Sequence, residues 1–208
     1  MGTIINSGNL KFASQAFVHW YNSTNEAQKL IVRHSCIAGA IVLIPIPIVG
    51  EVAIIVNQLA MYRGINRLAG ITFSQNVLKN LGKFLLSQVA GILGGMVTLF
   101  GIAAAVKFIP VANFLAGVAE APVAGITNYI CGIAYFEMLG GYIKAGGGSF
   151  LSDEETLRRM KEHSLSDDDI RNLKSEAKEK MKDVDYASFK SEAAAVVEEA
   201  KNNEDKYK

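Results

Sequence analysis

Apolar residues along most of the chain recur three and four positions apart, the spacing of helices with one buried face. In the first segment this spacing predicts a short helix that ends near Asn22. Ser23 and Glu26 have the spacing of a capping box, which predicts a second helix. That helix can run to Ile44, because Pro45 disfavours helical geometry in the residue before it. The pattern as a whole predicts an all-α fold.

A turn rich in proline and glycine follows the second predicted helix. Pro45 and Pro47 hold the backbone extended, and Gly50 permits a tight turn. Glu51 is predicted to start a third helix, because an acidic side chain is favoured at a helix N-terminus. The uncharged stretch 35–50 has 16 residues, whereas about 20 are needed to cross a bilayer as a helix. We therefore expect this helical hairpin to be buried or interfacial.

The longest uncharged stretch, residues 84–106, predicts a membrane crossing. Its 23 residues lie between Lys83 and Lys107. As a helix it would extend about 34 Å, more than the roughly 30 Å of a hydrocarbon core. Gly91 and Gly95 within it have the four-residue spacing that lets membrane helices approach closely. This stretch is the best candidate for a transmembrane helix.

A second apolar stretch predicts a return crossing over residues 121–143. Basic residues precede the first predicted crossing and Lys144 follows the second. By the positive-inside rule, this distribution puts both termini in the cytoplasm. The turn and small residues that we expect to shape these segments are Pro45, Pro47, Gly50, Gly91, Gly95, Pro110, Gly117, Gly125 and Gly132.

Charge divides the chain into two parts. Residues 1–150 hold nine basic and four acidic groups, and residues 151–208 hold 12 and 16. Capping signatures at Ser152 and Ser166, together with apolar stripes, predict two or three amphipathic helices in the second part. We therefore predict an apolar membrane-associated domain over residues 1–145, a glycine-rich linker over 146–150 and a charged helical tail over 151–208.

The sequence contains no recognisable catalytic or nucleotide-binding motif. Gly82-Lys83 is followed by Phe84, so the phosphate-binding loop Gly-x-x-x-x-Gly-Lys-Ser/Thr is missing. The three histidines are scattered, and Cys36 and Cys131 lie in apolar stretches where inert core thiols are expected. The formal net charge of +1 argues against a nucleic-acid partner. We expect no enzymatic activity, no cofactor and no metal site.

Three of the four acidic residues in the first 150 stand out: Glu51, Glu120 and Glu137. Two interpretations stay open. These side chains are helix caps and interface anchors, or they form an internal polar site that lines a path, because intramembrane acids are functional candidates by default.

Residues 28–144 resemble a bacterial family described only as domain of unknown function 697. The carrying residues are Ile44-Pro45-Ile46-Pro47 with Gly50-Glu51, then Gln58, Met61 and Tyr62 before Leu68-Ala69-Gly70, and later Lys107-Phe108-Ile109-Pro110-Val111, Gly117 to Gly125, Thr127-Asn128-Tyr129 and Gly132. In family members a glycine commonly follows the second proline directly, whereas Ile48 and Val49 intervene here, and Val111-Ala112-Asn113 lacks the glycine usual after the later proline, as in a divergent member. The resemblance implies a helical membrane protein, associated with Era-like GTPases, and supplies no catalytic residues.

These observations together predict a non-enzymatic, membrane-anchored adaptor or scaffold in the inner membrane of a bacterium. Its expected partners are the lipid bilayer and a protein bound through residues 151–208, for which the resemblance suggests a separate Era-like GTPase. A channel or pore-forming homo-oligomer is the first alternative. The second is a soluble all-helical protein with a buried apolar hairpin.

Overall fold

The computed structural model describes residues 7–44, 49–93, 110–148 and 151–202, and these residues form helices and connecting turns without any strand. For residues 7–14, 49–51, 93 and 110–120 it describes the backbone alone. The elements are α1 (Ser7–Asn22), α2 (Thr24–Val42), α3 (Val49–Leu68), α4 (Gln75–Leu93), α6 (Pro110–Lys144), α7 (Asp153–Glu162), α8 (Asp167–Met181), the 3₁₀ turn η1 (Tyr186–Phe189) and α9 (Lys190–Asn202). The predicted all-α fold class is confirmed.

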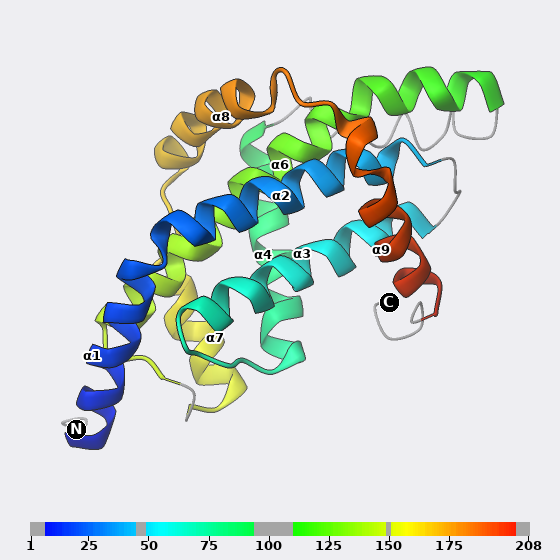
Figure 1. Cartoon of the computed structure of the whole chain (residues 1–208). Coiled ribbons are helices and arrows are strands. Elements are labelled where there is room, and N and C mark those ends of the chain that lie inside the picture. Colours follow the sequence, from blue (N-terminus) through cyan, green and yellow to red (C-terminus); the bar gives the residue numbers. More distant parts are fainter. Residues whose placement is uncertain (1–6, 45–48, 94–109, 149–150, 203–208) are drawn as a thin grey trace.

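Helix α6 is the axis around which the other helices pack. It has 35 residues, which corresponds to a length of about 52 Å. Helix α2 runs antiparallel along it, and α1, α4 and α8 also contact it (Figure 1). Its longest buried side chains include Tyr129, Tyr135 and Tyr142. The second half of α6 is therefore enclosed by helices of the same chain.

The two predicted membrane crossings are not confirmed. None of the helices in the described part of the chain combines the length and the apolar character that spanning a bilayer requires. Residues 84–93 belong to α4, where Leu85 and Val89 are fully buried, and residues 94–106 lie outside the described residues. Residues 121–143 contain tyrosine and amide groups that bond within the body, such as the Tyr135 hydroxyl, which donates to Asn66 at 2.7 Å.

A row of amide side chains on α3 is buried at the centre of this body. Asn57 bonds twice to His34 on α2, at 2.8 and 2.9 Å. Gln58 donates to the Tyr62 hydroxyl, and the Tyr62 ring stacks on Tyr135 with centroids 4.0 Å apart. Because buried polar groups are costly unless paired, this row fixes how α3 sits against its neighbours.

The two cysteines are buried and free, as expected from their apolar surroundings. Burial raises the pKa of the Cys131 thiol to about 12, and it raises the pKa of Cys36 as well. Because the thiolate is the nucleophilic form, neither cysteine is available as a nucleophile near neutral pH. Both side chains act as small apolar residues of the core.

The capping box predicted at Ser23 and Glu26 is wrong. The Ser23 side chain makes no cap bond to α2; its hydroxyl donates back to the Trp20 carbonyl at 2.9 Å. The reason is that α1 continues into α2 with one intervening residue, whose ψ of 1° is far from the extended geometry of an N-cap. Ser166, in contrast, forms a complete capping box with Asp169.

The C-terminal tail packs against the apolar helices and shares their core. Helix α8 contacts α6, and α9 lies across α2 and α3 (Figure 1). The tail residues that join the core are Met160, Ile170, Ala177, Met181, Ala193, Val197 and Ala200, all at most 3% exposed. The apolar stripes predicted for the tail are thus satisfied inside the same molecule.

Gly132 shows how the small residues of α6 are used. A Cβ atom at this position would lie 2.7 Å from Cγ2 of Ile31 and 3.0 Å from the Met61 sulfur. Both neighbours are fully buried, so α2 and α3 approach α6 more closely than any larger residue would allow. At Gly91, by contrast, none of the described residues comes within 4 Å of such an atom.

This difference gives a matched pair of substitutions. Gly132→Ala should lower the free energy of unfolding by about 1–3 kcal/mol, because the β-branched Ile31 cannot move aside in a filled core. Gly91→Ala should leave stability unchanged or raise it by up to about 1 kcal/mol, because alanine favours the helix. Urea denaturation followed by circular dichroism measures both. Equal effects would contradict the close packing at Gly132.

Candidate functional site

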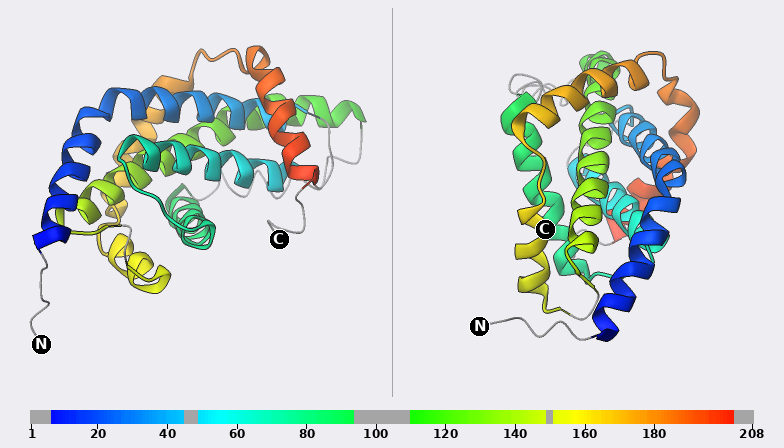
Figure 2. Two further views of the ribbon diagram at one scale, coloured as in Figure 1. Left: turned by 60° about the horizontal axis from the view of Figure 1, so that its bottom comes forward. Right: turned by 90° about the vertical axis from the view of Figure 1, so that its left-hand side faces the viewer.

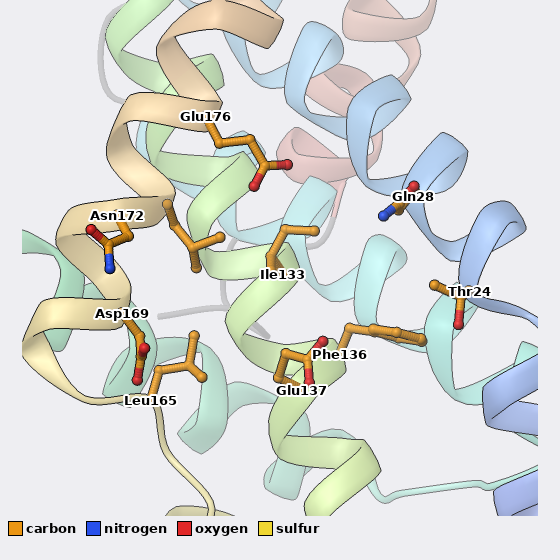
Figure 3. Close-up of a pocket in the computed structure, with 10 residues that line it drawn as sticks. Thr24, Gln28, Ile133, Phe136, Glu137, Leu165, Asp169, Asn172 and Glu176 are labelled. Atoms are coloured by element: carbon orange, nitrogen blue, oxygen red, sulfur yellow. The ribbon is translucent and has the colours of Figure 1, made fainter.

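An open groove lies between α2, α6 and α8 and has a volume of about 510 Å³. Figure 3 shows the side chains of the three helices converging on it. The lining residues are Thr24, Gln28, Ile133, Phe136, Glu137, Leu165, Asp169, Asn172, Leu173 and Glu176. We refer to these ten residues as the acidic groove.

Helical spacing explains why these residues share one surface. On α6, Ile133 and Glu137 are four residues apart, so they project from the same face. Helix α8 presents Asp169, Leu173 and Glu176 in the same way. The capping box at Ser166 fixes where α8 begins and therefore which of its residues turn toward α6. The groove thus follows from the register of α8 against α6.

The groove combines an apolar floor with an acidic rim. Ile133, Phe136, Leu165 and Leu173 supply the apolar surface. Three carboxylates surround it, those of Glu137, Asp169 and Glu176, and the lining within the described part of the chain includes no lysine or arginine. Gln28, Asn172 and Thr24 add neutral polar groups from the two flanking helices. The side chains of Glu137, Asp169 and Glu176 belong to exposed residues, so they can meet a ligand from solvent.

Glu176 is held in place by a tyrosine of the central helix. The Tyr129 hydroxyl donates a hydrogen bond of 2.6 Å to its carboxylate. Burial raises the pKa of Tyr129 well above its usual range, and the bond to Glu176 raises that pKa further. Tyr129 therefore stays protonated and keeps donating at any physiological pH. This contact ties one wall of the groove to α6.

An aromatic pair lies beneath the floor. The Trp20 ring stacks on Phe136 with centroids 5.0 Å apart, and its Nε1 donates to the Phe136 carbonyl at 3.1 Å. Trp20 is 8% exposed, and its ring packs directly against Gly140, where a Cβ atom would overlap it. Because the indole is anchored to the backbone of α6, the position of Phe136 in the groove is rigid.

One of the three acids singled out from the sequence lines the groove. Glu137 lies on its rim, whereas Glu51 and Glu120 lie in α3 and α6 at positions whose side chains are outside the described residues. Of these three glutamates, only Glu137 is therefore placed in a site by the described side chains. Asp169 was predicted only as part of the helix cap at Ser166, Glu176 was expected on a solvated face of the tail, and Gln28 was not singled out. The sequence signal that could have indicated the groove is the recurrence of acidic residues close to Leu165 and Leu173.

The prolines and glycines that were predicted to shape the apolar segments lie in different parts of the structure. Pro45, Pro47 and Gly95 lie outside the described residues, Pro110 begins α6, and Gly50 and Gly117 lie within α3 and α6. Gly125 and Gly132 pack against other helices of the body. None of the described members of this set lines the acidic groove.

The groove offers apolar, amide, hydroxyl and carboxylate groups to a ligand. Its lining contains no histidine, cysteine or serine that would act as a nucleophile or general base. Among the described side chains there is also no grouping of three His, Cys, Asp or Glu residues that would hold a metal ion. Carboxylates around an apolar floor suit a ligand with a cationic head and an apolar stem.

Comparison with family models, with curated proteins and with solved structures finds no match for this chain. The resemblance to domain of unknown function 697 therefore stays a prediction.

A double-mutant cycle tests the link between Tyr129 and Glu176. Tyr129→Phe and Glu176→Ala should each lower the free energy of unfolding by about 1 kcal/mol, because an exposed acceptor is partly screened by solvent. The double variant should lose little more than either single one, since both remove the same bond. Glu179→Ala, at an exposed position of α8, is the control and should change stability by less than about 0.5 kcal/mol.

Proposed function

We propose that this chain is a non-enzymatic, membrane-anchored adaptor whose acidic groove binds a basic amphipathic segment of a partner protein. The groove carries the proposal: three carboxylates surround an apolar floor, and none of its described lining residues is a lysine or an arginine. A helix that alternates leucines with lysines or arginines at helical spacing complements such a surface in both shape and charge.

Charge complementarity selects this class of partner. Lysine and arginine bury apolar stems while their charged heads reach outward, so the stems would lie on Leu165 and Leu173 and the heads on the acidic rim. Opposite charges at a rim accelerate association and exclude acidic competitors more than they add affinity. The binding should therefore weaken as salt is added.

The location of the groove agrees with a role for the C-terminal tail in partner binding. Five of its ten lining residues come from the region 165–176. The partner expected from the family resemblance, an Era-like GTPase, is the candidate that we propose to examine first. In this arrangement the tail contributes one wall of the binding site and α6 and α2 contribute the rest.

Membrane attachment is proposed for the end of the molecule where α2 ends and α6 begins. No charged residue occurs in residues 35–44, which contain the end of α2, in 52–62 of α3 or in 110–119 of α6. We call this end of the molecule the apolar pole. The beginning of α6 extends beyond the other helices there (Figure 2). The uncharged stretch 94–106 precedes it in sequence and has 13 residues, too few for a helix to span a bilayer, which supports shallow insertion.

A labelled peptide tests the groove. We use a 16-residue helical peptide of leucine and lysine with its basic residues on one face, and measure fluorescence anisotropy. Glu137→Gln combined with Glu176→Gln should weaken binding about 3- to 10-fold, because two rim charges are lost. Asp169 is left unchanged because it caps α8.

The control has the same change in net charge. Glu154→Gln combined with Glu179→Gln removes two exposed acids outside the groove and should leave the peptide affinity unchanged. Equal weakening by both double variants would show that the peptide responds only to net charge. That result would contradict docking in the groove.

Vesicle flotation tests the membrane attachment. The wild-type chain should float with vesicles of phosphatidylethanolamine and phosphatidylglycerol. Leu99→Asp should reduce the bound fraction several-fold, because a carboxylate is costly to place among lipid chains. Val18→Asp changes an apolar residue that is 56% exposed on α1, and it should have no effect. A wild-type chain that stays unbound would favour the alternative of a soluble helical protein.

A further inference from the structure

Aromatic side chains form a continuous row from the surface of α1 to the floor of the acidic groove. Tyr21 stacks on Phe17 with ring centroids 6.5 Å apart, and Phe17 stacks on Trp20 at 5.7 Å. Trp20 in turn stacks on Phe136, which lines the groove. Tyr21 is 68% exposed, so the outer end of this row is an aromatic residue that a ligand can reach from solvent.

Tyr21 lies on the side of its helix that borders the groove. Thr24 and Gln28 line the groove (Figure 3) and follow Tyr21 by three and seven positions, which is the spacing of one helical face. Ser23 makes helical backbone hydrogen bonds of 3.0 and 2.8 Å in both directions, so the helix runs on from α1 into α2. The Thr24 hydroxyl also donates to the Tyr21 carbonyl at 2.9 Å. Tyr21 therefore extends this wall of the groove by one turn.

The aromatic row already holds one cation of the chain itself. The Lys144 ammonium lies 5.2 Å from the centroid of the Trp20 ring and 5.5 Å from that of Phe17. A cation within about 6 Å of an aromatic face is attracted by the π-system. Among the described side chains, no lysine or arginine makes such a contact with Tyr21. Tyr21 is thus the ring of the row that can take a cation from a partner.

Two charges on α6 act on a cation at this place. The ammonium of Lys144 repels it, and the carboxylate of Glu137, which lines the groove together with Thr24, attracts it. Both residues are exposed, so salt screens both interactions. Because these two effects oppose each other, the contact with the Tyr21 ring decides which kind of cation is preferred.

We propose that Tyr21 is a recognition residue of the acidic groove and stacks on an arginine of the basic partner segment. This inference rests on the proposed function and names the residue type that the partner carries at this end of the groove. Arginine is favoured over lysine because its planar guanidinium stacks on aromatic faces and is more weakly hydrated than an ammonium. The groove therefore selects basic segments with an arginine at the end that reaches α1.

Two labelled peptides of equal charge test this contact. One is the 16-residue peptide of leucine and lysine, and the other has arginine at every lysine position. Fluorescence anisotropy gives the ratio of their dissociation constants, and the wild-type chain should bind the arginine peptide more tightly. Tyr21→Leu should lower this preference about 2- to 5-fold, because it keeps an apolar side chain but removes the π-system. An unchanged circular dichroism spectrum checks that the helices are kept.

Three variants serve as controls. Tyr21→Phe keeps the ring and should keep the preference for arginine. Val18→Ala shortens an apolar side chain that is 56% exposed on α1; it lies six positions before Thr24, on another face of the helix, and should also keep the preference. Glu137→Gln combined with Glu176→Gln should weaken the binding of both peptides, because both depend on the acidic rim.

The outcomes separate this inference from the proposed function. Peptide binding without a preference for arginine in the wild-type chain, or with a preference that survives in Tyr21→Leu, would overturn the role of Tyr21 and leave docking in the groove standing. An equal loss of affinity for both peptides in Tyr21→Leu would show a general apolar contact and would overturn arginine recognition. If neither peptide binds the wild-type chain, both the inference and the proposed groove function are refuted.

Discussion

The close approach of several helices to α6 is the constraint on which the rest of the structure depends. The side chains of Ile31 and Met61 pack against Gly132. The Trp20 ring packs against Gly140, and the Tyr186 ring packs against Gly125. Each contact requires a position without a Cβ, so the spacing of glycines along α6 sets the positions of α1, α2, α3 and η1. Small residues four apart are used in membranes for the same purpose, which is why the sequence of α6 resembles a membrane helix although its second half is enclosed by the chain itself.

The described structure separates two kinds of surface. At one place, three carboxylates surround an apolar floor between α2, α6 and α8. At the other end, the helices carry no charge over long stretches and are crossed by α9, whose outer side is charged. The proposed adaptor role would use two such surfaces, one for a protein and one for a bilayer. Both α2 and α6 contribute to each of them, so these two helices connect the groove with the apolar pole.

Helical periodicity was enough to predict the all-α class, a helix between Ser23 and Ile44, which the structure has as Thr24–Val42, and the amphipathic stripes of the tail. It could not predict where the stripes would dock, because a stripe such as Ile170, Ala177 and Met181 fits a partner protein as well as its own body. The membrane crossings were predicted from the absence of charge. The sequence does not reveal that polar groups in such a stretch find partners in the folded chain, as the Tyr135 hydroxyl does when it donates a hydrogen bond to Asn66. The groove could not be predicted because its walls come from three helices, of which α2 lies more than 100 positions before the other two, and only Glu137 was predicted as a possible site residue.

The position of Trp20 gives the molecule an intrinsic optical signal. It is the sole tryptophan of the chain, and its indole stacks on Phe136, whose other side lines the groove. Indole emission depends on the polarity and motion of what surrounds it. Any ligand that presses on Phe136 would therefore shift the emission of a single, unambiguous fluorophore, and unlabelled protein would report occupancy of the site directly.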